Sequence, residues 1–137
     1  EERVGAVTFR FTPAIFRQAN LDAFERIIDQ VVAFVPKGSR VCELYSGIGV
    51  IGLNVLMRTE AEWVRCSDNN PNLQGPFCAA VQTLPAPLRP RATFTAMSGL
   101  DALRAGDAEG ANVLVVDPPR KGLSEQEVRM LCTGDEL

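Results

Sequence analysis

The chain has 137 residues, of which 46% are hydrophobic and 23% charged, as in an ordinary globular domain. This length is that of one domain, predicted to span residues 1–137, with an N-terminal strand and lead-in over 1–20 and an α/β core over 21–137. The formal net charge of −3 disfavours a large phosphate-binding surface within this chain alone.

Several classes of protein are disfavoured by what the sequence lacks. No apolar run approaches the roughly 20 residues of a membrane span, and no signal peptide precedes the first strand, so we expect an intracellular protein without membrane contact. The four cysteines form no C-x-x-C pair, which disfavours a disulfide framework or a zinc site. Histidine, the commonest general base and metal ligand, is absent, and no metal is expected.

The periodicity of apolar residues predicts the elements of the first half of the chain. They are a strand over 7–11 that ends at Thr12-Pro13, a helix over 21–34 with Asn20 as its N-cap, a strand over 40–44, and a helix of roughly ten residues from Val50.

The second half continues the alternation of strands and helices. Its predicted elements are a strand over 62–67, a helix over 73–83, a strand over 92–96, a short helical piece over 101–104, a strand over 112–116, and a helix through Leu131 that a capping box at Ser124 and Glu127 begins. The continuous apolar run at 112–116 is typical of a central parallel strand buried on both faces. The order of elements predicts an α/β fold with a doubly wound, mostly parallel sheet.

A glycine-rich loop joins the predicted strand over 40–44 to the helix that follows it. Gly47, Gly49 and Gly52 form a G-x-G-x-x-G pattern, and Asp68 ends the next strand 21 residues after Gly47. In this context the pattern predicts a nucleoside-cofactor site, where the acid accepts hydrogen bonds from ribose hydroxyls. A purely structural glycine turn is the alternative.

Glu43, just before this loop, bears on which cofactor is bound. Its charge would repel the pyrophosphate that a dinucleotide places at a helix N-terminus. A cationic ligand would gain instead, and S-adenosylmethionine (SAM) carries a sulfonium and an ammonium group. The sequence therefore favours SAM, although Glu43 could also serve only to cap amides of the loop.

A second loop, Asp117-Pro118-Pro119-Arg120, follows the apolar run at 112–116. Two prolines make its backbone stiff, because each fixes φ and provides no donor. Asp117 could bind an amide or amine edge of a substrate, and Arg120 a phosphate or a carboxylate. Ligands bind beyond the carboxyl ends of parallel strands, so both loops should face one crevice. The alternative is a rigid surface turn with a solvated arginine.

Four stretches resemble motifs of the RNA uracil-C5 methyltransferases, which make 5-methyluridine in transfer and ribosomal RNA. They are Phe16-x-Gln18-x-Asn20, the loop Glu43-Leu44-Tyr45-Ser46-Gly47-Ile48-Gly49, Asp68-Asn69-Asn70, and Asp117-Pro118-Pro119-Arg120-Lys121-Gly122. The resemblance implies a Rossmann-like SAM-dependent methyltransferase fold that is incomplete at the C-terminus. It implies SAM binding by Gln18, Glu43, Tyr45, Ser46, Gly47, Gly49, Asp68, Asn69, Ser98 and Asp117. The target uracil would lie at Asp117, with Arg120 as a second catalytic residue.

The chemistry of that family is covalent. A cysteine thiolate adds to C6 of uracil, which makes C5 nucleophilic enough to take the methyl group, and a base then removes the C5 proton. The family's nucleophile comes after a further strand in an S-C context, which Cys132 does not match, while Cys42 and Cys66 lie in predicted strands and are expected to be packing residues. We therefore expect this chain to bind SAM but not to complete methyl transfer alone. The RNA, a tRNA or an rRNA, would be bound largely by regions outside it.

Three alternatives remain from the residues. An N-methyltransferase acting on an exocyclic amine of a base could also use Asp117-Pro118-Pro119, although such enzymes more often carry an aromatic residue where Arg120 stands. A non-catalytic SAM-binding module would retain the glycine loop. A nicotinamide-binding Rossmann domain is disfavoured by Glu43.

Overall fold

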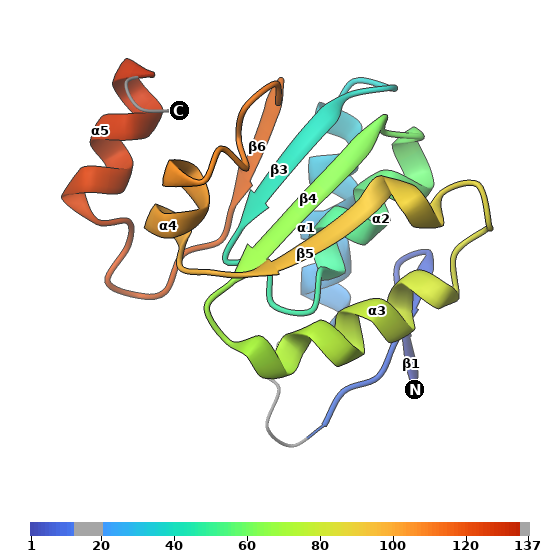
Figure 1. Cartoon of the computed structure of the whole chain (residues 1–137). Helices are drawn as coiled ribbons and strands as arrows, with labels where there is room; N and C mark the ends of the chain where they lie inside the picture. The colour runs from blue at the N-terminus through green and yellow to red at the C-terminus, as the bar shows by residue number, and fades with distance from the viewer. Residues whose placement is uncertain (13–20, 135–137) are drawn as a thin grey trace.

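The structure, a computed structural model, describes residues 1–12 and 21–134. Its centre is a four-stranded parallel sheet with the strand order β5-β4-β3-β6 (Figure 1). The strands are β3 (Arg40–Leu44), β4 (Trp63–Asp68), β5 (Ala92–Ala96) and β6 (Val113–Val116). Because all four run in the same direction, the loops that follow them emerge at one edge of the sheet.

Helices cover both faces of this sheet. Residues of α1 (Leu21–Phe34), α2 (Val50–Thr59) and α3 (Gln74–Gln82) belong to the larger hydrophobic core, together with Val41 of β3. The smaller core joins α4 (Gly99–Arg104) and α5 (Glu125–Thr133) to Cys42 and Leu44 of β3. Successive residues of a strand point to opposite faces, so these memberships confirm the predicted doubly wound arrangement.

A short antiparallel hairpin precedes the sheet and is fixed to α2 by one buried side chain. It consists of β1 (Glu2–Val4) and β2 (Val7–Phe9). Asn54 of α2 is fully buried, and its Oδ1 accepts a hydrogen bond from the Ala6 amide at 2.8 Å. Its Nδ2 donates to the Val4 carbonyl at 3.1 Å and to the Val50 carbonyl at 2.7 Å. One amide therefore satisfies the polar backbone of the hairpin turn inside the core.

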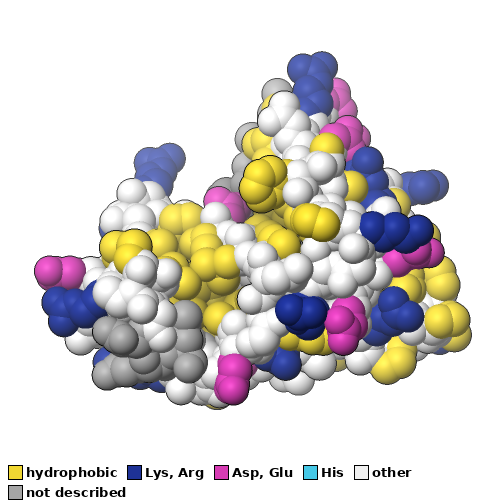
Figure 2. All heavy atoms as spheres, turned by 90° about the horizontal axis from the view of Figure 1, so that it is seen from above, with side chains coloured by type: hydrophobic (Ala, Val, Ile, Leu, Met, Phe, Trp, Pro, Cys, Tyr) yellow, Lys and Arg dark blue, Asp and Glu magenta, His cyan; other side chains and the backbone are white. Residues whose placement is uncertain are grey.

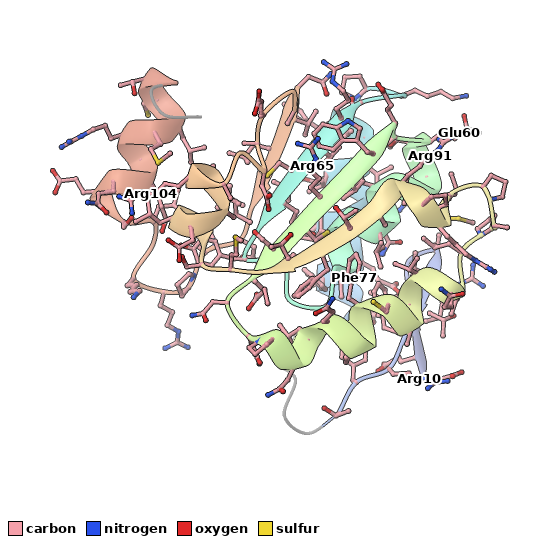
Figure 3. All side chains as sticks on the ribbon, viewed as in Figure 1. Arg10, Glu60, Arg65, Phe77, Arg91 and Arg104 are labelled. Atoms are coloured by element: carbon pink, nitrogen blue, oxygen red, sulfur yellow. The ribbon has the colours of Figure 1, made fainter. Side chains whose placement is uncertain are left out.

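An aromatic contact packs α3 against strand β5 of the sheet. A 3₁₀ turn, η1 (Pro71–Leu73), leads into this helix, and Asn70 caps the turn by accepting from the Asn72 amide. Phe77 points from α3 towards the sheet (Figure 3), and its ring centroid lies 5.3 Å from that of Phe94 on β5. A second 3₁₀ turn, η2 (Arg89–Arg91), leads into β5.

Most predicted elements are confirmed, and their bounds shift by a few residues. The structure has α1, α2, β3 and β5 where the sequence predicts them. The predicted helix over 73–83 is divided into η1 and α3, and the predicted strand over 62–67 ends one residue later, at Asp68. The predicted strand over 7–11 is shorter, since β2 ends at Phe9, and β1 was not predicted. The predicted cap Asn20 lies outside the described residues.

The prediction of a central strand at 112–116, buried on both faces, is wrong. Among the described residues, β6 pairs with β3 alone and forms an edge of the sheet. None of its residues is fully buried, and Leu114 is 38% exposed.

Large hydrophobic side chains are also exposed on helices, with Phe34 at 82%, Ile27 at 54% and Val128 at 45%. Figure 2 shows hydrophobic side chains gathered in a hollow on one face of the molecule.

Candidate functional site

The loops at the carboxyl ends of the strands line a cavity of about 1000 Å³. The glycine loop contributes Tyr45 to Ile48, the end of β4 contributes Asp68 to Asn70, and the loop after β6 contributes Asp117 to Leu123. Ser98, after β5, and Glu127, on α5, complete this part of the wall. Both loops singled out in the sequence thus face one cavity, as expected for an open α/β sheet.

The conformation of the glycine loop needs residues without a side chain. Gly47 and Gly49 have φ values of +57° and +86°, in the left-handed region that glycine adopts at little cost. A Cβ atom at Gly49 would also lie 2.8 Å from the ring of Phe77. Gly49 does not line the cavity, so the structure gives it a packing role, and its predicted contact with a cofactor stays a prediction.

Asp68 connects the end of β4 to the glycine loop. Its Oδ2 accepts a hydrogen bond from the Gly47 amide at 3.0 Å, and its Oδ1 accepts from the Asn70 amide at 3.1 Å. The carboxylate is therefore held at the cavity wall by two backbone donors, with further acceptor capacity left on both oxygens. Asn69 beside it is exposed and also lines the cavity.

Glu43, near the end of β3, has a buried carboxyl group. Its side chain is 2% exposed, and its Oε1 accepts from the Gly52 amide of α2 at 3.1 Å and from the Cys66 thiol at 3.5 Å. Burial raises the pKa of Glu43 to about 8, and the hydrogen bond from Gly52 opposes this shift. The alternative role of capping loop amides is thus present in the structure, together with a place in the cavity wall.

Gly52 makes this arrangement sterically possible. A Cβ atom there would lie 2.7 Å from Oε1 of Glu43 and 3.0 Å from Sγ of Cys66. The third glycine of the pattern therefore lets the helix approach the strand closely, rather than contacting a ligand.

Tyr45 forms the wall on the side of α5. Its φ of 57° is unusual for a residue other than glycine, and its hydroxyl donates to Glu127, whose two carboxylate oxygens lie 2.8 Å and 2.7 Å away. Burial and the Glu127 contact raise the pKa of Tyr45 to about 12. The predicted capping box at Ser124 and Glu127 is only half formed. Ser124 accepts from the Glu127 amide at 3.2 Å, while the Glu127 side chain turns to Tyr45.

Sequence reasoning missed Glu127 as a residue of the site. Its position three residues after a serine gave it a sufficient local explanation, as the acid of a capping box. The only pattern that could have revealed it is its place on the buried side of α5, one turn before Met130, which is 5% exposed.

The remaining predicted residues fall into two groups. Ser46 and Ser98 line the cavity, but both hydroxyls have local partners, since Ser46 donates to the Gly47 carbonyl at 3.1 Å and Ser98 caps α4 by accepting from the Asp101 amide at 3.1 Å. Gln18 lies outside the described residues, and its predicted role stays a prediction.

The loop after β6 presents its charged residues at the cavity. Asp117, Arg120 and Lys121 are exposed and line it. The turn is closed by a hydrogen bond from the Gly122 amide to the Pro119 carbonyl at 2.8 Å, with Gly122 at a φ of +76°. The loop thus brings a carboxylate and two cations to the cavity on a constrained backbone.

The cysteines lie away from this cavity. All four are in the described part of the chain, and none lines it. Cys42 and Cys66 are buried, which raises the pKa of Cys42 to about 12 and that of Cys66 well above its usual value. Both side chains are therefore packing groups of the core, as predicted. Cys78 and Cys132 are exposed.

Two further findings concern residues 1–12 and 21–134 only. No three His, Cys, Asp or Glu side chains gather there in a way that could bind a metal ion. No helix in that part has both the length and the apolar character that crossing a bilayer requires.

Curated relatives match nearly the whole chain. The chain is 35% identical over 130 residues to an uncharacterized RNA methyltransferase of Protochlamydia amoebophila. This match covers 95% of the chain and 33% of the relative. The chain is also 32% identical over 134 residues to a 23S rRNA (uracil(747)-C(5))-methyltransferase of Pyrococcus horikoshii, with 97% and 30% covered. These similarities confirm the resemblance drawn from the motifs. The chain spans about a third of the length of these relatives, and no family model matches it.

Solved structures confirm the fold. The Pyrococcus abyssi tRNA (uracil-54, C5)-methyltransferase, solved in complex with S-adenosyl-L-homocysteine, superposes with a TM-score of 0.75 at 24% identity, covering 95% of this chain and 30% of that one. The glycopeptide N-methyltransferase MtfA gives a TM-score of 0.56 at 17% identity, with 79% and 49% covered. Methyltransferases of different chemistry share this fold, so the fold alone does not choose between them.

Proposed function

We propose that residues 1–137 form one domain, the SAM-binding core of an RNA methyltransferase that acts on C5 of uridine in tRNA or rRNA. The observation that carries the proposal is the single cavity that joins the glycine loop and Asp68 to the Asp117-Pro118-Pro119-Arg120 loop. Relatives named as RNA and 23S rRNA uracil-C5 methyltransferases support the substrate class. The tRNA uracil-C5 methyltransferase bound to S-adenosyl-L-homocysteine supports the cofactor.

The residues of the cavity fit this cofactor. A cavity of about 1000 Å³ is large enough for a nucleoside ligand and part of a second molecule. Asp68 can accept from the ribose hydroxyls at the end of β4, and Tyr45, Ser46, Gly47, Asn69 and Ser98 would surround the rest of the cofactor. When bound, SAM would supply the methyl group.

Asp117 and Arg120 are proposed to serve the substrate. Asp117 can accept a hydrogen bond from the N3–H of uracil, which would orient the ring edge towards the cofactor. Arg120, exposed beside it, can hold a phosphate of the RNA backbone. The target base must leave its stack to reach this cavity.

The nucleophilic thiolate is proposed to come from outside these 137 residues. No cysteine of the chain lines the cavity, and the two within the sheet, Cys42 and Cys66, are buried. We therefore expect the chain to bind the cofactor without completing methyl transfer by itself. Its net charge of −3 supports the expectation that most of the attraction for RNA comes from other regions.

Calorimetric titration of the full-length protein with S-adenosylhomocysteine, with NADH as comparator, tests the cofactor. Binding of the first ligand alone, lost in Asp68→Ala but kept in Glu62→Ala, would support the proposal. Glu62 is a suitable control because it is an exposed acid just before the opposite end of β4. NADH binding would overturn the proposal.

Product analysis after incubation with SAM and RNA tests the reaction. The proposal expects 5-methyluridine. N-methylated bases would favour an N-methyltransferase that uses Asp117 to grip an exocyclic amine. Cofactor binding with no methylated product from any tRNA or rRNA would favour a non-catalytic SAM-binding module.

A further inference from the structure

Glu127 is a buried carboxylate with fewer partners than its charge requires. It is 5% exposed, lies in the first turn of α5 and lines the cavity. Its two oxygens approach a single hydroxyl, that of Tyr45, at 2.8 Å and 2.7 Å. A hydroxyl has one proton to donate, so one oxygen is left without a donor. Within the described part of the chain, no lysine or arginine forms an ion pair with Glu127.

Holding Tyr45 in place does not explain this charge. The phenol group of Tyr45 already packs closely against Gly99, where a Cβ atom would lie 3.0 to 3.1 Å from it. An uncharged amide oxygen would also accept the hydroxyl proton. Burying a carboxylate near an apolar core is costly unless a cation or several donors compensate for the lost water.

Three other carboxylates line the cavity, those of Glu43, Asp68 and Asp117, and Asp117 is exposed, so its charge needs no compensating cation. Oε1 of Glu43 accepts from the Gly52 amide and the Cys66 thiol, and Asp68 accepts from two backbone amides, so each of these two carboxylates has two donors. The Glu127 carboxylate, in contrast, has the Tyr45 hydroxyl as its single donor, which lies within hydrogen-bond distance of both oxygens. Because that hydroxyl has one proton to donate, the carboxylate keeps acceptor capacity for a ligand in the cavity.

We propose that Glu127 is a specificity-determining residue that receives a positively charged group of the cofactor. The inference rests on the proposed function, because SAM carries a sulfonium and an ammonium group, whereas S-adenosylhomocysteine carries the ammonium group alone. The free oxygen of Glu127 would form a charge-assisted contact with one of these groups, and the bound cation would compensate for burial of the carboxylate.

Calorimetric titration of the full-length protein with SAM and with S-adenosylhomocysteine, in the absence of RNA, tests the inference. Glu127→Gln keeps the length of the side chain and an acceptor for Tyr45 but removes the charge. We expect its Kd for SAM to rise at least about tenfold, since contacts to charged groups are stronger than neutral ones. A loss for SAM alone identifies the sulfonium as the group received, and a loss for both ligands identifies the ammonium. Either result supports the inference.

Glu125→Gln provides the matched control, because Glu125 is exposed and lies two residues earlier on the same helix. An equal loss in both variants would show a long-range effect of net charge and overturn the inference, as would unchanged binding of both ligands by Glu127→Gln. Circular dichroism of each variant at the titration temperature checks that it is folded.

A double-mutant cycle separates a direct contact from an effect through Tyr45. If Glu127 contacts the ligand, Glu127→Gln weakens SAM binding by a similar factor in the wild-type protein and in Tyr45→Phe. If Glu127 acts only by holding the hydroxyl, it has no further effect in Tyr45→Phe, and the inference is overturned. Failure of the wild-type protein to bind either ligand would instead refute the proposed function, so the two failures are distinguishable.

Discussion

Glu43 should make the stability of this protein depend on pH in a way that one substitution removes. Its carboxyl group is fully buried beside Cys66, and burial raises its pKa from 4.5 to about 8. The folded protein therefore binds a proton that the unfolded chain releases above about pH 4.5. The contribution of Glu43 to the free energy of unfolding is fully present below about pH 4.5. It is lost as the pH rises through the pKa of the folded state, about 8. Glu43→Gln retains the shape and the acceptor for Gly52 but cannot ionise.

The size of the effect follows from the displacement of the pKa. Each pH unit corresponds to about 1.4 kcal/mol, so the window from pH 4.5 to about 8 corresponds to about 5 kcal/mol. Near pH 5 the wild type and Glu43→Gln should have similar free energies of unfolding. Near pH 8 the variant should be the more stable protein by several kcal/mol, because the wild type must bury a charge or bind a scarce proton.

Urea denaturation of both proteins at half-unit steps between about pH 5 and pH 8 measures this difference. Comparing the two curves cancels the titration of every other group that the proteins share. Glu62→Gln, at an exposed position, should follow the wild type throughout. If the curves for the wild type and Glu43→Gln remain parallel over the whole range, Glu43 is not held uncharged by burial and the reasoning is wrong.

Two other substitutions test how the site is supported, each by urea denaturation against a control on the same or a neighbouring helix. Asn54→Ala should lower the free energy of unfolding by about 2–4 kcal/mol, since it leaves the buried Val4 carbonyl and the partly buried Ala6 amide of the hairpin unpaired. Thr59→Val, also buried on α2, should cost less than about 1 kcal/mol, and equal losses would contradict this account of Asn54. Gly49→Ala should cost at least about 1 kcal/mol because of its positive φ and the nearby aromatic ring. Gly75→Ala, in open space on α3, should be neutral or stabilising, and a neutral Gly49→Ala would show that the loop can rearrange.

The predictions that succeeded depend on short-range sequence patterns. The helix over 21–34 follows from apolar residues at helical spacing, and the strand over 40–44 from an apolar run that ends in a glycine turn. The two loops of the cavity were predictable for the same reason. Each comes directly after a strand, and the parallel arrangement brings the ends of all strands to one edge.

The predictions that failed depend on partners that a local pattern does not specify. The apolar run at 112–116 has the composition of a buried strand, but within the part of the chain that the structure describes it pairs with β3 alone. Strand β1 has three residues and is stabilised by Asn54, some fifty positions away. Glu127 had a sufficient local role as a helix cap, whereas its contact with Tyr45 joins residues 82 positions apart.

Glu43 shows how a correct residue can be chosen for an incomplete reason. The sequence argument relied on a full negative charge that repels a pyrophosphate and attracts a cation. The structure instead buries this carboxyl, raises its pKa to about 8 and gives it the Gly52 amide as a partner. At neutral pH its attraction for a cation is therefore weaker than the sequence argument assumed, and cation binding there would have to displace a proton. Under the proposal made for Glu127, selectivity for a cationic cofactor would depend mainly on this other buried carboxylate, which has a single donor and lies on α5.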